Sequence, residues 1–214
     1  MSDTSIDVFI DLPSFPGPVQ AGRLWSHFRK GRESASFEYN KEWLANPHRF
    51  ALEPLLPLAD GTFHTNPGQS VFGAIGDSTP DRWGRILMRR AELARARTAN
   101  ESPHTLSELD YLLRVNDEAR QGALRFSQDG GQSFCAPPGS TPIPPLVNLS
   151  RLLHAADHFC RDDENAEDLR LLLAPGSSLG GARPKASVKD KKGNLCIAKF
   201  PRHDDEYDVV AWEA

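Results

Sequence analysis

The chain has 214 residues, with 25 Lys and Arg against 29 Asp and Glu, and a formal net charge of −4. This length can bury one large core or two small ones, and the overall charge does not favour a nucleic-acid-binding protein. No apolar run approaches the 18 residues that indicate a membrane helix, and no charged segment followed by an apolar one predicts a signal sequence. The three cysteines, Cys135, Cys160 and Cys196, show neither metal spacing nor a disulfide framework, which is typical of a cytoplasmic protein.

The N-terminal part carries strand patterns separated by turns. Alternating apolar and polar residues predict strands over 6–12, 21–29, 34–39 and 122–126. Lys30-Gly31 has the chemistry of a tight hairpin turn between the second and third of these strands. A helix is expected over 107–115, so this part of the chain predicts a small β-rich unit with helices.

A longer helix is predicted to start at Thr79-Pro80-Asp81, with a cap, a proline at the first position and an acid in the first turn. It should run to about Arg97, with Trp83 and Leu87 in its buried stripe. Four arginines, at positions 82, 85, 89 and 90, crowd its other sides. They could bind nucleic acid or an acidic partner, but pairing with acids of the same chain is the favoured interpretation.

The region 128–145 is rich in Gly, Pro and Ser and predicts a linker between residues 1–127 and 146–214. Two helices follow, over 146–160 and 164–173, and then a hairpin over 185–189 and 195–201. His154 and His158 are one helical turn apart, but no third ligand stands out, so no metal site is predicted. The whole chain therefore predicts an α+β fold.

The stretch from Gly176 to Lys185 is the strongest candidate for a binding site. It contains three glycines and two serines, and its surroundings are basic. Gly180 and Gly181 allow a backbone with positive φ that approaches a ligand closely, and such a turn can form a concave nest of N–H groups for an anion. The composition suits a phosphate-binding loop, but a plain turn would have the same composition.

Lys199 is a charge inside the apolar run 195–200, and two interpretations of it stay open. In kinase-like folds a strand lysine holds nucleotide phosphates under a Gly-rich loop and is steadied by a helix glutamate, a role that Glu213 could fill. Alternatively, Lys199 faces water on an edge strand and protects it from aggregation, and Glu213 is an ordinary solvated helix residue.

Several motifs agree in order with one known family. They are Gly176-Ser-Ser-Leu-Gly-Gly-Ala-Arg-Pro-Lys185, Ala198-Lys-Phe-Pro201, Ala211-Trp-Glu-Ala214, Asp77-Ser-Thr-Pro-Asp-Arg-Trp-Gly-Arg85 and Arg120-Gln-Gly-Ala-Leu-Arg-Phe126. Together they resemble the HipA family of bacterial toxin kinases, from about Gly22 to the end of the chain. The resemblance implies that the residues after 145 begin the Gly-rich-loop part, similar to the N-lobe, of a HipA-type kinase fold.

The resemblance also implies a set of site residues and cofactors. Nucleotide-binding residues would be Ser177, Ser178, Leu179, Gly180, Gly181, Ala182, Arg183, Lys185, Lys199 and Glu213. ATP and Mg²⁺ would be the cofactors, and Ser178 matches the position that the family autophosphorylates. The catalytic-loop aspartate and asparagine and the metal-binding aspartate of the family belong to a C-terminal lobe, and we expect that lobe to be absent from this chain.

The resemblance implies a serine/threonine kinase toxin that phosphorylates an aminoacyl-tRNA synthetase and causes growth arrest and persistence. A helix-turn-helix antitoxin, HipB-like, would be its partner, and operator DNA would be reached through that antitoxin. We expect the chain to be inactive alone. It could be a fragment, the product of a frameshifted gene, or one half of a split enzyme whose second chain supplies the catalytic lobe. Alternatively, it could be a non-catalytic binding module or a degenerate remnant. Ile197, Phe200 and Trp212 are expected to expose apolar surface where the second lobe would pack.

Overall fold

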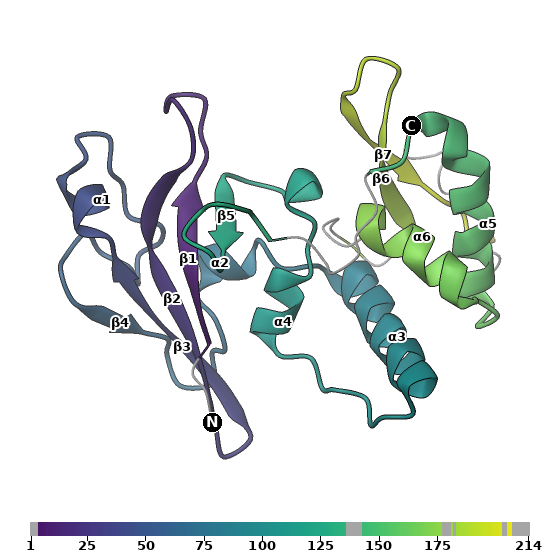
Figure 1. Cartoon of the computed structure of the whole chain (residues 1–214), viewed down its shortest axis with the longest axis horizontal. Helices are drawn as coiled ribbons and strands as arrows, with labels where there is room; N and C mark the ends of the chain where they lie inside the picture. The colour runs from purple at the N-terminus through teal and green to yellow at the C-terminus, as the bar shows by residue number, and fades with distance from the viewer. Residues whose placement is uncertain (1–3, 136–142, 177–180, 182, 203–204, 207–214) are drawn as a thin grey trace. The chain divides into compact units, whose positions relative to one another are not determined.

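The computed structural model describes residues 4–135, 143–176, 181, 183–202 and 205–206 (Figure 1). They contain helices and strands in a mixed arrangement, which confirms the predicted α+β class. The chain divides into two compact units, and the polypeptide passes between them more than once. The first unit comprises Met1–Thr79, Ser107–Leu113 and Arg120–Cys135, and the second comprises Pro80–Leu106, Arg114–Ala119 and Ala136–Ala214.

The first unit is built on an antiparallel sheet with the strand order β4-β3-β2-β1-β5. The strands are β1 (Thr4–Ile10), β2 (Val19–Arg29), β3 (Arg32–Tyr39), β4 (Thr62–His64) and β5 (Leu124–Ser127). Four of them were predicted from the alternation of apolar and polar residues, and β4 was not. Lys30 and Gly31 have φ of 50° and 75° and form the predicted turn between β2 and β3.

One face of this sheet is covered by the helices α1 (Lys41–Ala45), α2 (Gly73–Gly76) and α4 (Glu108–Leu113). Trp43 of α1 and Phe37 of β3 are fully buried in the resulting core, and Leu112 brings α4 into it. Gly22 leaves room for this packing, because a Cβ at that position would clash with the Phe37 ring and the backbone oxygen of Glu38. The first unit therefore has a complete hydrophobic core of its own.

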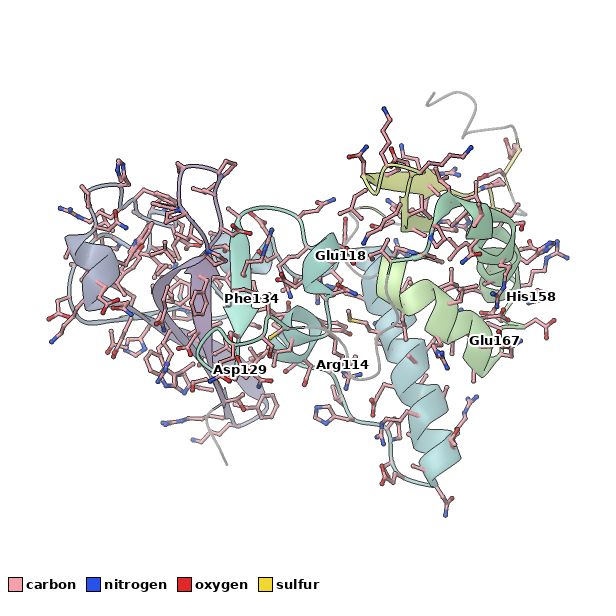
Figure 2. The ribbon with its side chains drawn as sticks, turned by 45° about the horizontal axis from the view of Figure 1, so that its top comes forward. Arg114, Glu118, Asp129, Phe134, His158 and Glu167 are labelled. Atoms are coloured by element: carbon pink, nitrogen blue, oxygen red, sulfur yellow. The ribbon has the colours of Figure 1, made fainter. Side chains whose placement is uncertain are left out.

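The beginning of the predicted linker folds onto the first unit. Phe134 meets Phe9 edge to face, with ring centroids 5.4 Å apart, and the Cys135 N–H donates to the Phe126 oxygen at 2.8 Å (Figure 2). Asp129 closes the loop between them by accepting from the Ser133 backbone N–H at 2.9 Å. The predicted domain division at 127 and 145 stays a prediction, and the packing shows only that 128–135 is well structured.

The second unit contains α3 (Arg82–Ala99), η1 (Asp117–Ala119), η2 (Leu146–Asn148), α5 (Leu149–Cys160), α6 (Ala166–Gly176), β6 (Lys185–Lys189) and β7 (Leu195–Lys199). α3 and α5 pack against α6, and the β6–β7 hairpin closes the same core. Its large buried side chains include Trp83, Leu87, Phe159 and Leu172. The predicted hairpin is confirmed, and its turn at 190–194 is held by Asp190, which accepts from the N–H groups of residues 192 and 194.

The predicted start of α3 was wrong by two residues. Asp81, not Thr79, is the N-cap, and its side chain accepts from the Arg82 N–H at 2.6 Å. The Thr79 hydroxyl instead donates to the Gly76 oxygen at 2.6 Å at the end of α2. Thr79 is therefore committed to the preceding helix, and the carboxylate of Asp81 takes the cap position.

Intramolecular pairing, predicted for the arginines of α3, is confirmed for Arg90. Its guanidinium donates to Glu164 at 2.8 Å, also bonds Asp162, and lies over the Phe159 ring at 4.1 Å from the centroid. Arg82 and Arg89 are exposed, and neither forms an ion pair with the residues that the structure describes.

The expectation of exposed apolar surface near the end of the chain is confirmed in part. Ile197 is 56% exposed, but Phe200 is only 3% exposed because it packs into the second core. Trp212 lies outside the described residues. None of the described helices combines the length and the apolar character that crossing a bilayer requires.

Candidate phosphate-binding site

Four of the predicted site residues are described, namely Gly181, Arg183, Lys185 and Lys199. The others lie outside the described residues: Ser177, Ser178, Leu179, Gly180, Ala182 and Glu213. The described part of the site is therefore the C-terminal end of the Gly-rich stretch, the hairpin that follows it, and the helix α3 to which Gly181 is bonded.

Gly181 is tied to the N-terminus of α3. Its N–H donates to the carboxylate of Asp81, and its oxygen accepts from the Trp83 N–H at 3.1 Å. Gly181 has φ of 90°, a backbone conformation that residues with a Cβ rarely adopt. The end of the Gly-rich stretch is thus fixed to a helix that lies about 100 residues earlier in the sequence.

Lys185 lies directly over Gly181. A Cβ built at Gly181 would be 2.7 Å from the Lys185 Nζ, so the end of the lysine side chain lies against this glycine. The backbone oxygen of Lys185 accepts from Trp83 Nε1 at 3.0 Å, and the buried Trp83 ring meets Phe159 edge to face at 5.0 Å. The start of β6 is therefore anchored through the tryptophan to the hydrophobic core.

Asp81 is the acid of this cluster. The hydrogen bond from the Gly181 N–H, together with that from the Arg82 N–H and the nearby charge of Lys185, lowers the pKa of Asp81 below its ordinary value. The carboxylate is therefore ionised at neutral pH, and it satisfies backbone donors of both the helix end and the loop.

Lys185 and Lys199 face each other across the β6–β7 hairpin. Their Cα atoms are register partners, so the two side chains leave the same face of the hairpin. Lys199 is exposed, and so are Leu195 and Ile197 on that face, at 48% and 56%. An exposed lysine at this position is compatible with both predicted roles, phosphate binding and protection of an edge strand.

The other end of the same face is neutralised within the second unit. Lys189 of β6 forms an ion pair with Glu118 of η1, which is labelled in Figure 2. Arg183 likewise donates to Asp205 at 2.9 Å, and this bond, with one from the Arg202 N–H, lowers the pKa of Asp205. Lys189 and Arg183 are therefore each paired with an acid of the second unit.

Sequence reasoning missed the contributions of Asp81, Trp83 and Asp205 to this site. Asp81 and Trp83 were assigned to the start and the buried stripe of a helix, and nothing in the sequence indicates a partner about 100 residues away. It also missed a cavity of about 650 Å³ in the second unit, to which Arg151, Glu167 and Arg170 contribute; none of the described site residues lines it. Within the described part of the chain, no group of three His, Cys, Asp or Glu could hold a metal ion.

Comparison with protein families gives one match. Residues 17–127 match the model of the HipA N-terminal domain, which is more than half of the chain. This chain belongs to the HipA N-terminal domain family. The family assignment made from the motifs is therefore confirmed, and two of those motifs, 77–85 and 120–126, lie inside the matched range. The Gly-rich stretch, Lys199 and Glu213 follow the HipA N-terminal domain, and their roles stay predictions. Comparison with curated proteins found no match.

Proposed function

We propose that this HipA-family chain is the N-terminal part of a toxin serine/threonine kinase and supplies the phosphate-binding half of an ATP site. The observation that carries the proposal is the fixed arrangement of Gly181 and Lys185 on the N-terminus of α3, with Lys199 opposite Lys185 in the hairpin. Two ammonium groups on one face, beside a positive-φ glycine, suit the charge and size of nucleotide phosphates.

The residues of this site position and neutralise charge. Phosphoryl transfer depends mainly on placing the nucleotide and compensating charge at its phosphate oxygens. In the proposed site Lys185 and Lys199 bind phosphate oxygens, and Asp81 holds the Gly-rich stretch in place through Gly181. Mg²⁺ would reduce the charge of the bound nucleotide, with its protein ligands supplied by the C-terminal lobe of the family. Phosphorylation of Ser178 would add about two negative charges and compete with ATP for the lysines.

The wider role follows from the family in the same way. We propose a toxin whose target is an aminoacyl-tRNA synthetase, whose activity causes growth arrest in the cytoplasm, and which a helix-turn-helix antitoxin bound to operator DNA neutralises. The described part of the chain offers no catalytic aspartate in a kinase-loop spacing, so we expect no phosphate transfer by the chain alone.

Nucleotide binding tests the proposal directly. ATP with Mg²⁺ is titrated into ¹⁵N-labelled full chain, and amide shifts are followed by NMR. We expect shifts at Gly181 and Lys185 with a dissociation constant of about 1 mM, because only half of the site is present. Lys185→Ala and Lys199→Ala should each weaken binding by about fivefold or more.

Lys189→Ala is the matched control, since Lys189 leaves the same face of β6 but is paired with Glu118. It should leave ATP binding unchanged. Shifts that are absent at 10 mM ATP, or that survive both lysine substitutions, would contradict the proposal.

A second candidate function is that of a non-catalytic module or of one half of a split toxin. Leu195 and Ile197 favour it, because two large apolar side chains are exposed on the hairpin face that a second lobe would cover. The nucleotide sequence directly downstream separates the candidates: a reading frame with an Asp-x-x-x-x-Asn loop supports a split enzyme, and its absence supports a binding module or a remnant.

A further inference from the structure

The turn between β2 and β3 ends a two-stranded ribbon that no third described strand extends. In the described part of the chain, which begins at Thr4, β1 pairs with β2 as far as Ser26, and β4 pairs with β3 over Ser36–Glu38. From His27 to Ser34, β2 and β3 therefore pair only with each other among the described strands (Figure 1). The end of this ribbon, Phe28–Arg32, is exposed throughout, and we call it the hairpin tip.

The hairpin tip carries three positive charges in four residues. Arg29 and Arg32 are direct register partners, and Lys30 occupies the turn between them. All three are exposed, and none forms an ion pair with a residue that the structure describes.

Two features of the tip are unfavourable for the isolated fold. Like charges directly opposite each other in an antiparallel pair are destabilising, and Arg29 faces Arg32. Lys30 has φ of 50°, a conformation in which asparagine or glycine is preferred. Local stability thus argues against these residues, whereas a bound polyanion would offset the repulsion between Arg29 and Arg32.

The acid that follows the tip in the sequence is engaged by α4. Glu33 follows Arg32, and its carboxylate accepts from the backbone N–H groups of Glu108 and Leu109 at 2.9 and 3.3 Å. Glu33 therefore serves the first turn of α4 and forms no ion pair with the described cations of the tip.

We propose that the hairpin tip binds double-stranded DNA, with the ribbon in the major groove and the three cations on phosphates. The major groove accepts a two-stranded β-ribbon, and arginine suits phosphate oxygens through its forked donors. Phe28 is 55% exposed beside the cations and can contact a thymine methyl group. Because the chain as a whole has a net charge of −4, such binding requires a local basic element of this kind. The proposal is independent of the kinase role.

Fluorescence anisotropy with a labelled 20-base-pair duplex tests it. At 50 mM salt we expect a dissociation constant of about 10⁻⁵ M for the full chain, in the range of non-specific DNA binding. Three phosphate contacts predict a slope of about −2.7 for log K against log salt concentration. The triple variant Arg29→Thr, Lys30→Asn, Arg32→Thr should lose at least about tenfold in affinity, with a slope near zero. Lys30→Asn gives the turn its preferred Asn-Gly sequence, so the variant should melt no lower than the parent.

The control variant is Lys41→Gln, Lys191→Asn, Lys192→Asn. It removes the same net charge from exposed positions elsewhere and should bind the duplex as the parent does. Equal binding by the tip variant, or no binding by the parent at 50 mM salt, would overturn the proposal. Tighter binding of the matching single strand would overturn the groove geometry, and NMR shifts of the tip with polyglutamate but not with duplex would assign an acidic protein surface instead.

Discussion

Glu92 gives the sharpest test of the energetics, because it is a buried carboxylate in the middle of α3. Its side chain is only 3% exposed. The carboxylate accepts from Arg95 Nη2 at 2.8 Å and from the His104 backbone N–H at 3.1 Å. Arg114, labelled in Figure 2, forms a third contact with it at 3.3 Å. The hydrogen bonds from Arg95, followed by the His104 N–H and the charge of Arg95, lower the pKa of Glu92 from 4.5 to about 2. The charged form is therefore favoured in the folded chain.

This difference sets both a magnitude and a pH window. Each pKa unit is worth about 1.4 kcal/mol, so at pH 7 the ionised Glu92 stabilises the folded chain by about 3 kcal/mol. A depressed pKa contributes above the unfolded value and loses its contribution as the pH falls through the folded value. At pH 3, between the two values, about 1 kcal/mol should remain.

Glu92→Gln keeps the shape and an acceptor for the His104 N–H but removes the charge. Urea unfolding of the full chain, followed by tryptophan fluorescence, should give a loss of about 2–3 kcal/mol in the free energy of unfolding at pH 7 and about 1 kcal/mol at pH 3. Glu101→Gln is the matched control, because Glu101 binds the same Arg95 at 2.8 Å but is 58% exposed. It should cost less than about 0.5 kcal/mol at either pH. An equal loss in both variants, or a loss for Glu92→Gln that does not change with pH, would refute the reasoning.

Three further substitutions test other contacts. Asp81→Ala removes the cap of α3 and the acceptor for Gly181; it should cost about 1 kcal/mol and increase hydrogen exchange at the Gly181 amide, and unchanged exchange would contradict the tie. Gly22→Ala should lower the melting temperature, measured by calorimetry, because the new methyl group would clash with the Phe37 ring. A melting temperature within about 2 °C of the parent value would contradict this prediction. Tyr39→Phe should lower the free energy of unfolding in urea by about 1–3 kcal/mol, because the hydroxyl donates to the Leu56 oxygen at 2.7 Å and accepts from the Leu52 N–H at 3.0 Å. Burial raises the pKa of Tyr39, so this loss should be the same at pH 6 and pH 9.

The regular elements of the fold were largely readable from local pattern. β1, β2, β3 and the β6–β7 hairpin alternate clearly, and their turn chemistry at Lys30-Gly31 and at 190–194 is strong. β4 and α2 were missed because they contain three and four residues, lie among prolines and glycines, and depend on pairing and packing with distant segments. The start of α3 was misplaced because Thr79 had two possible helices to serve, and only the three-dimensional structure shows which one it caps.

The residues of the candidate site also fall into a group that was predicted from the sequence and a group that was not. Gly181, Lys185 and Lys199 were predicted because a Gly-rich stretch and a lysine inside an apolar run are visible in a sequence and match the family's motifs; their roles stay predictions. Asp81 and Trp83 act on residues about 100 positions later, and one sequence carries no signal for such a contact. Glu92 was missed for a related reason: a charge on a helix predicts solvent exposure, unless a partner such as Arg114, 22 residues away, is known to neutralise it.

The placement of α3 has a consequence for how this protein family can be dissected. The matched range ends at residue 127 and includes α3, yet α3 contributes Trp83 and Leu87 to a core completed by residues 152–200. A gene fragment cut at the family boundary would therefore encode an amphipathic helix without its apolar cover, a species prone to chaperone capture and self-association. The range matched by the family and the unit that folds cooperatively do not coincide here. Truncated variants should therefore fold when the cut respects the folding unit, whether or not it respects the family boundary.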